Sequence, residues 1–377
     1  VISKFAAAIA LLMAITFFTT AQAQITTAIR GVVVNQQDEA VTDASVKITH
    51  TASGTVSLAT SNENGVFSAR GLRVGGPYSV EISGSGFSAV RIDDLYLALD
   101  RTLNLPVTIE AEAAIEEVRV VATRQSVGYK NQGLGTDLGI EALEEVASID
   151  RDITDAAAQN PFAIINVQSG GAKELTIAGA NNRFNSLTVD GVALNDRFGL
   201  NANGYPTQRS PISYDAIESL SIQTAPFDVE YNGFTGGTIN AVTKSGTNEF
   251  FGSLAYYSTD DSLVGDKNKE RDFDFTFEEE TLVATLGGPI IQDKLFFFVA
   301  YDKYEEVAPL SNGPVGSGAL NIREGITLDD VAEVGQIVSD VWGFDIGGFS
   351  KEPAEDEKIL ANIDWNISDA HRAKFTY

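Results

Sequence analysis

The sequence predicts a chain of mixed fold class: a β-sandwich, then an α/β domain, then the first antiparallel strands of an incomplete transmembrane β-barrel. Three observations lead to this prediction. Short strands with regular Gly and Asn turns occupy residues 24–108, and helical spacing is confined to the middle of the chain. Residues 251–377 alternate apolar and polar side chains over strands of about ten residues.

Composition excludes several classes of function. The 377 residues include 52 acidic and 26 basic side chains, giving a net charge of −26, whereas nucleic-acid binding requires clustered Lys and Arg. The chain has no cysteine, and its two histidines, His50 and His371, are far apart. Thiol catalysis is excluded, and no His-based zinc motif or triad stands out. We therefore expect no enzyme: no catalytic residues, cofactor or metal, and no nucleic-acid partner.

Residues 1–23 are expected to be a secretory signal peptide. Lys4 supplies a positive charge, residues 5–18 are mostly apolar, and the small residues within 19–23 form a cleavage site. The apolar run is short for a membrane-spanning helix, which needs about 20 residues. The mature protein is therefore expected in the periplasm, outside the cell or in a bacterial outer membrane.

Residues 24–108 predict a small antiparallel β-sandwich. The run Ala44–Thr49 alternates with period two, and turns such as Ser61–Gly65 separate the strands. The stretch resembles the carboxypeptidase regulatory-like domain in Gly31-Val32-Val33, Ala44-Ser45-Val46, Asn64-Gly65-x-Phe67 and Tyr78 followed by Gly86-Phe87. Because zinc ligands are missing, we expect a structural or docking module here and no peptidase activity.

Residues 109–125 form a charged linker that contains one β-branched run. The run has two interpretations. It is either a linker strand paired with the preceding sandwich or an exposed strand that adds to the sheet edge of a partner. The residue types alone favour the first. The run consists of Glu117, Val118, Arg119, Val120, Val121 and Ala122.

Residues 126–250 predict mixed α/β structure. Ile140, Leu143 and Val146 have helical spacing, and a second short helix is expected over 153–159, before Pro161. A further helix is expected around Tyr214 to Glu218. Strands are expected at 174–179, 186–194, 220–223 and 238–244.

The order of four short motifs in this region resembles the plug domain of TonB-dependent outer-membrane receptors. The motifs are Ile177-Ala178-Gly179, Val189-Asp190-Gly191, Ala216 to Ile222 and Gly236 to Gly246. The resemblance implies that Glu117 to Ala122 is the TonB box. Two positions depart from the family pattern: Thr224-Ala225-Pro226 lacks its usual Arg, and Ala178 stands where Arg is common. The run Pro226–Gly237 is similar to the Oar-like branch, whose members also begin with a regulatory-like domain.

Residues 251–377 predict membrane β-hairpins. On the strand Lys358–Ile367, one face is apolar and the other largely polar, which is typical of a large barrel with a polar lumen. A soluble sandwich with one wet face shows the same alternation. Five aromatic residues are expected in the girdles at the membrane boundary. They are Tyr256, Tyr257, Tyr301, Tyr304 and Trp365.

The two long connections between these strands are acidic. Residues 260–280 contain nine acidic and three basic side chains, net −6, and residues 305–357 contain twelve and two, net −10. A solvated outer face is the expected reading. The alternative is a vestibule that attracts cations or holds Ca²⁺.

Five strands do not close a barrel around a plug, so we expect this chain to be the N-terminal part of a longer protein. The resemblance implies an outer-membrane receptor that takes up an unidentified ligand, energised by TonB and its inner-membrane complex, with outer-membrane lipid around the barrel. The alternative is an outer-membrane protein for adhesion or surface organisation with little transport. The sandwich and plug are expected on the periplasmic side.

Overall fold

The computed structural model describes residues 26–99, 101–111, 118–121, 135–148, 151–167, 173–196, 198–207, 209–224, 234–263, 267–268, 271–272, 277–308, 310–347, 353–368 and 371–377. The predicted signal peptide and most of the Oar-like run lie outside these residues. The chain divides into two compact units, residues 1–210 with 217–244, and residues 211–216 with 245–377. Over the described residues, no helix is both long and apolar enough to span a membrane.

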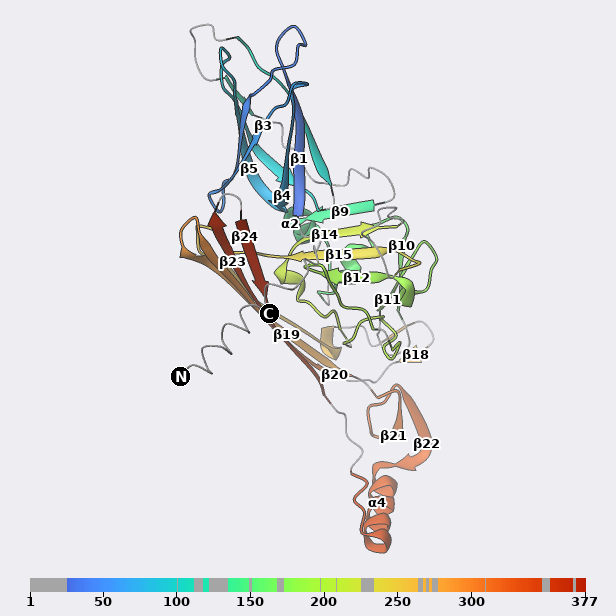
Figure 1. The fold of residues 1–377 in the computed structure, drawn as a ribbon. Coiled ribbons are helices and arrows are strands. Elements are labelled where there is room, and N and C mark those ends of the chain that lie inside the picture. Colours follow the sequence, from blue (N-terminus) through green and yellow to red (C-terminus); the bar gives the residue numbers. More distant parts are fainter. Residues whose placement is uncertain are drawn as a thin grey trace, which may run out of the picture. The chain divides into compact units, whose positions relative to one another are not determined.

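The first part of the chain is the predicted β-sandwich (Figure 1). One sheet has the order β3-β2-β5-β6-β8 and the other the order β4-β1-β7. Two pairings, β1 with β7 and β6 with β8, are parallel, whereas the sequence predicted an antiparallel fold. A parallel neighbour requires a crossing connection, so neither pairing is a hairpin. The strands are β1 (Thr26–Val34), β2 (Ser45–His50), β3 (Thr55–Thr60), β4 (Val66–Arg73), β5 (Gly75–Ser83), β6 (Val90–Leu97), β7 (Thr102–Thr108) and β8 (Val118–Val121).

The sandwich core explains one of the motifs seen in the sequence. Ile29 and Val33 of β1 are fully buried beside Phe67 of β4, in one apolar cluster that both sheets share. Gly31 lies between them in β1. A Cβ on Gly31 would lie 2.1 Å from the Leu105 carbonyl oxygen and 2.4 Å from the Phe67 ring. A side chain is therefore sterically excluded at this position.

The second part is an α/β domain around a five-stranded mixed sheet of order β13-β12-β15-β14-β9. Two of the three expected helices are present, α2 (Ile140–Glu145) and α3 (Ile153–Ala157). The third expected helix is a single 3-10 turn, η2 (Tyr214–Ala216), because β14 begins at the next residue. The other elements are β9 (Gly135–Gly139), β10 (Ala163–Val167), β11 (Lys173–Ile177), η1 (Asn182–Phe184), β12 (Ser186–Val189), β13 (Val192–Ala193), β14 (Ile217–Gln223) and β15 (Thr238–Thr243).

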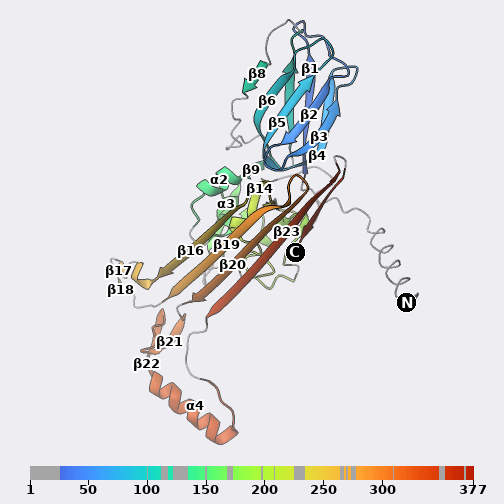
Figure 2. The ribbon, with the colours of Figure 1, turned by 90° about the vertical axis from the view of Figure 1, so that its left-hand side faces the viewer.

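The third part is an open antiparallel sheet of order β16-β19-β20-β23-β24, as predicted for the first barrel strands (Figure 2). Consecutive strands of this sheet are neighbours, which is the arrangement of an up-and-down barrel. The strands are β16 (Phe251–Asp260), β19 (Glu278–Ile291), β20 (Leu295–Val307), β23 (Ala354–Ser368) and β24 (His371–Thr376).

The register assigns the five expected girdle residues to two different faces. Tyr256, Tyr301 and Trp365 share a face with exposed apolar residues such as Leu254, which is 78% exposed. Tyr257 and Tyr304 lie on the opposite face, with the buried Phe298. The girdle prediction is therefore wrong for these two residues. Residues separated by an odd number along a strand point to opposite faces, which the sequence-based assignment neglected.

The two long acidic connections contain short elements of their own. The first holds η3 (Asp261–Leu263), β17 (Lys267–Asn268) and β18 (Arg271–Asp272). The second holds β21 (Asn312–Val315), β22 (Asn321–Thr327) and the helix α4 (Leu328–Trp342), which the sequence analysis did not predict. Thr327 and Asp330 form a reciprocal capping box at the start of α4, and Gly343 ends it in the left-handed conformation.

Candidate functional site

The segment that resembles a TonB box lies at the edge of the sandwich. Val118–Val121 form β8, whereas Glu117 and Ala122 lie outside the described residues. β8 pairs in parallel with β6, from Val90 opposite Val118 to Asp93 opposite Val121. This pairing agrees with the interpretation of the segment as a linker strand. Partner binding by the same residues stays a prediction.

Asn185 links β11, which leads into the first plug-like motif, to the glycine pair of the last motif, and the sequence analysis missed it. Its Nδ2 donates to the Leu175 carbonyl oxygen at 2.7 Å, and its Oδ1 accepts from the Gly237 backbone N–H at 3.0 Å. A Cβ on Gly236 would lie 2.4 Å from Asn185 Oδ1. The glycine pair at 236–237 therefore lets the backbone approach this amide closely. An isolated Asn before a strand gives no such signal in sequence.

Asp190 joins the second motif to the last one. Its φ of 46° and the φ of 77° at Gly191 form a two-residue hairpin between β12 and β13, for which Asp-Gly is a preferred sequence. The carboxylate then accepts hydrogen bonds from Thr243, at 3.0 Å from the backbone N and 2.5 Å from Oγ1. Asp190 is 8% exposed, so these bonds satisfy a buried charge. The motif order thus reflects contacts across the plug sheet.

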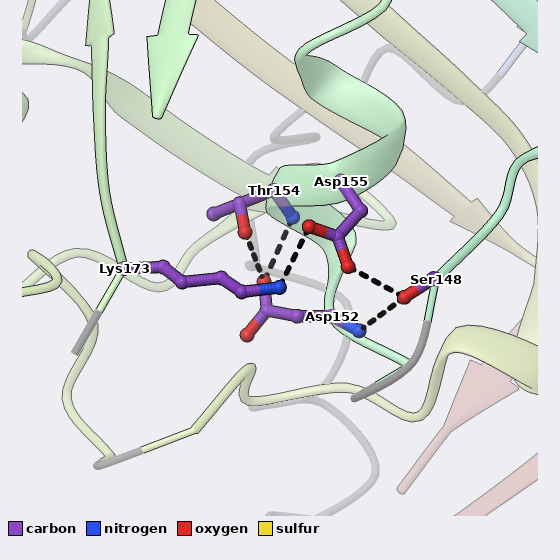
Figure 3. Close-up of polar contacts among 5 residues, drawn as sticks. All are labelled: Ser148, Asp152, Thr154, Asp155 and Lys173. Carbon is purple, nitrogen blue, oxygen red and sulfur yellow. Dashed lines mark hydrogen bonds and ion pairs between the residues drawn. The ribbon is translucent and has the colours of Figure 1, made fainter. Parts of the chain in front are cut away.

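A polar network fixes the start of α3 (Figure 3). Asp152 caps the helix by accepting from the Thr154 backbone N at 2.8 Å. Ser148 Oγ donates to Asp155 Oδ2 at 2.6 Å and accepts from the Asp152 backbone N at 3.1 Å. Lys173 of β11 reaches Asp155 Oδ1 at 2.7 Å. The ion pair therefore connects the β10–β11 hairpin to α3.

A buried carboxylate connects the first plug strand to the rest of the sheet. Asp137 on β9 accepts from Ser221 Oγ of β14 at 2.6 Å and forms an ion pair with Arg101, which precedes β7 of the sandwich. Burial raises the pKa of Asp137, and the contacts with Ser221 and Arg101 partly offset this rise. β9 is the strand that follows the linker, so Asp137 anchors the point where the linker enters the plug.

Asp196 organises an exposed loop of the plug. Its carboxylate accepts from the backbone N of Asn201 at 2.8 Å and from those of Phe198 and Gly199 at 3.0 Å. These N–H groups hold the pKa of Asp196 below its usual value, and the N–H of Asn201 contributes most to this shift. The loop so fixed displays Phe198 and Leu200, which are 89% and 84% exposed. The loop therefore exposes two large apolar side chains in a conformation that hydrogen bonds to Asp196 hold in place.

Acidic side chains lie opposite one another on the neighbouring barrel strands β19, β20 and β23. Like charges face one another at Glu279 with Glu306, Glu280 with Glu305, and Glu305 with Glu355, an arrangement that destabilises paired strands. Lys303 relieves part of this repulsion through an ion pair with Glu305, which takes part in two of these pairs. Within the described part of the chain, no group of three or more His, Cys, Asp or Glu side chains is placed to hold a metal ion.

Three family models match consecutive parts of the chain. The carboxypeptidase regulatory-like domain matches residues 28–110, the TonB-dependent receptor plug domain residues 141–238, and an outer membrane beta barrel domain residues 242–316. The three matches come in the order that the sequence motifs predicted.

Two curated relatives match more than half of this chain but less than a third of their own length. The TonB-dependent transporter Oar of Myxococcus xanthus is 30% identical over 60% of this chain and 22% of its own. The probable TonB-dependent siderophore receptor PirA of Acinetobacter baumannii is 26% identical over 62% of this chain and 30% of its own. The chain therefore spans less than a third of the length of either relative.

Solved structures show partial similarity as well. The siderophore receptor PirA from Acinetobacter baumannii has a TM-score of 0.43 and 18% identity, and covers 64% of this chain and 31% of that one. The outer membrane transporter YddB from Escherichia coli has a TM-score of 0.45 and 12% identity, covering 64% and 32%.

Proposed function

We propose, from the premise that this chain belongs to the TonB-dependent receptors of the outer membrane, that the protein takes up a ligand across that membrane with energy delivered through TonB. The family consists of outer-membrane transporters, which perform no chemistry on their ligand. Strand β8 supports the proposal most directly. In the order of the chain it lies between β7 of the sandwich and β9, the first strand of the plug, and residues 122–134 connect it to β9.

The proposed TonB box consists of Glu117, Val118, Arg119, Val120, Val121 and Ala122. Strand addition uses backbone N–H and C=O groups, and β-branched residues favour the extended conformation that it needs. TonB would therefore bind this segment as an added strand and pull on the plug. Outer-membrane lipid would contact the exposed apolar face of the barrel sheet, which includes Leu254 and Ile359.

Proline in this segment tests the proposal. Val120→Pro removes one backbone donor and fixes φ, so capture of the purified periplasmic domain of TonB by the full-length receptor should be lost. Val120→Thr keeps the donor and the β-branch and should retain capture. Receptor-dependent uptake should follow the same pattern in cells. Equal capture by both variants would contradict the proposal that TonB binds this segment and drives uptake through it.

The loop held by hydrogen bonds to Asp196 supports a role for Phe198 and Leu200 in ligand contact. Two large apolar side chains exposed close together in sequence on a fixed loop are typical of a binding surface. We place an apolar part of the ligand against them. Phe198→Ala with Leu200→Ala should reduce receptor-dependent uptake while leaving TonB capture unchanged, because the loop is remote in sequence from the box.

The second candidate function is adhesion or surface organisation with little transport. It is favoured by α4, an exposed amphipathic helix in the second acidic connection, with Val334, Ile337 and Val341 each about half exposed or more. Val120→Pro separates the two functions. A surface role that does not use TonB would survive this substitution, and cell–cell adhesion would then be the property to measure.

A further inference from the structure

We propose that the sandwich sheet holds the TonB box as its edge strand until TonB takes the strand over, so that β6 and TonB compete for β8. This inference rests on the proposed function and adds a regulatory element to it. It assigns to the regulatory-like domain a role in controlling access to the box.

The strand pairing supports the inference. β8 is the last strand of the sheet β3-β2-β5-β6-β8, and among the described residues its hydrogen-bonded neighbour in this sheet is β6 (Figure 2). The four residue pairs run without a register shift from Val90 and Val118 to Asp93 and Val121. All described residues of the box are therefore engaged in the pair.

The partner strand gives the pairing a physical reason. β6 has the burial pattern of a core strand, with Val90, Ile92, Leu95 and Leu97 buried. One edge of β6 pairs with β5, and β8 covers the start of the other edge. An open edge on a core strand is a template for unwanted pairing, and covering it removes that hazard. Pairing with β6 and strand addition to TonB both use backbone N–H and C=O groups of β8.

We infer exchange rather than addition of TonB to the free edge of β8, because the pairing of β8 with β6 spans only four residues. Each of its neutral hydrogen bonds contributes only a small net stability, and pairing with TonB would replace them at little net cost. TonB would then hold the strand in place of β6, and a pull on β8 would pass through residues 122–134 to Gly135 of the plug.

This competition lowers the apparent affinity of the receptor for TonB. When a binding site is free in only a fraction of the molecules, its apparent Kd equals the intrinsic Kd divided by that fraction. A covalent bond between β6 and β8 should therefore block TonB, and breaking that bond should restore binding.

Paired cysteines test this directly, because the natural sequence contains no cysteine. Arg91 and Arg119 are register partners in β6 and β8. Neighbouring strands lie about 4.8 Å apart, within the range that a disulfide can bridge. The full-length receptor with Arg91→Cys and Arg119→Cys should form the disulfide in outer membranes. The oxidised receptor should bind the purified periplasmic domain of TonB at least about tenfold more weakly than the same receptor after reduction.

The matched control keeps the Arg91→Cys substitution and changes its partner. Glu81 on β5 is the register partner of Arg91 on the other side of β6, and both residues are exposed. Glu81→Cys with Arg91→Cys therefore fastens two strands that stay together in either state. TonB binding by this control should be the same before and after reduction.

The outcomes separate this inference from the proposed function. If the 91–119 disulfide does not form in the resting receptor, β8 is not held on β6 and the inference is wrong. If it forms and the oxidised receptor binds TonB as well as the reduced one, TonB adds to the free edge; the inference then fails while the proposed function stands. If no form of the receptor, wild type included, binds TonB, both fail together.

Discussion

The sandwich and the plug differ in how far buried polar contacts stabilise them. The sandwich core is apolar: Ile29, Val46 and Ile82 are fully buried within one cluster that spans both sheets. The plug buries apolar residues as well, such as Leu138 and Leu220. It also buries polar side chains that are hydrogen-bonded across the domain, among them Asp137, Asn185 and Asp190. The plug therefore adds directional hydrogen bonds to side-chain packing.

The difference bears on what each domain can do. Apolar packing is lost as a unit, because removing one element exposes the surface it covered to water. A hydrogen-bonded contact can open and have its groups satisfied by water, at a net change of about 1 kcal/mol for each neutral bond. The hydrogen-bonded contacts of the plug can rearrange locally under tension, whereas the apolar core that β1, β2, β4, β5, β6 and β7 share should stay intact, whether or not β8 is paired with β6. This contrast fits the proposed roles of the two domains.

The largest expected loss of stability follows from a cavity in the sandwich core. Phe67 is 1% exposed, so Phe67→Ala should lower the free energy of unfolding of a soluble fragment, residues 24–121, by about 3–5 kcal/mol in urea denaturation. Leu58→Ala is the control on an exposed strand position, 65% exposed, and should cost less than about 0.5 kcal/mol. Equal losses from the two variants would contradict an apolar core as the source of stability.

A smaller loss is expected from the plug. Asp190→Ala leaves the Thr243 backbone N–H without this acceptor and should lower the free energy of unfolding of residues 24–250 by about 1.5–3 kcal/mol. Asp190→Asn keeps one acceptor oxygen and the turn preference, so it should cost less. The comparison between domains would break if Asp190→Ala destabilised the protein as much as Phe67→Ala does.

The sandwich and barrel strands were predictable because their signal is local. A strand with one buried face alternates at every second residue, and this pattern can be read from sequence alone. Assigning faces across strands needs register, which is why Tyr257 and Tyr304 were assigned to the wrong face. Helix α4 was missed although Thr327, Asp330 and Gly343 supply its capping signals, because its acidic surroundings were read as a loop.

The contacts of the candidate site were less predictable because they are long-range. Residues 186–194 were predicted as one strand, whereas Asp190 and Gly191 turn the chain between β12 and β13. Nothing in the motif points to Thr243, 53 residues after Asp190. The parallel pairing of β8 with β6 has no hairpin signal, since parallel neighbours are not adjacent in the chain. Both interpretations of the box could be stated from sequence, yet the partner strand could not be named.

The smallest expected effect is a local one, the response of the Asp196 loop to acid. Hydrogen bonds from backbone N–H groups hold the pKa of Asp196 below its ordinary value of 3.8, and the bond from Asn201 contributes most. A group with a lowered pKa in the folded state stabilises that state above its unfolded pKa, and this contribution is lost as pH falls through the lower, folded value. The loop should therefore loosen only below pH 3.8, while the apolar sandwich core stays unaffected in that range.

Limited digestion with pepsin, which is active in acid and cleaves beside Phe and Leu, measures this loosening at Phe198 and Leu200. Pepsin's own activity changes over this range, so each cutting rate is divided by the rate on an unstructured peptide at the same pH. So normalised, cleavage of residues 24–250 at the loop should rise as pH falls below about 3.8. Asp196→Asn removes the charge that the N–H groups stabilise, so its normalised rate of cleavage should be the same above and below that pH. Asp38→Asn, in a sandwich turn, should leave the wild-type pH dependence in place. If the loop is cut equally at every pH in the wild type, hydrogen bonding to Asp196 does not hold it, and Phe198 and Leu200 would have to be fixed by other contacts.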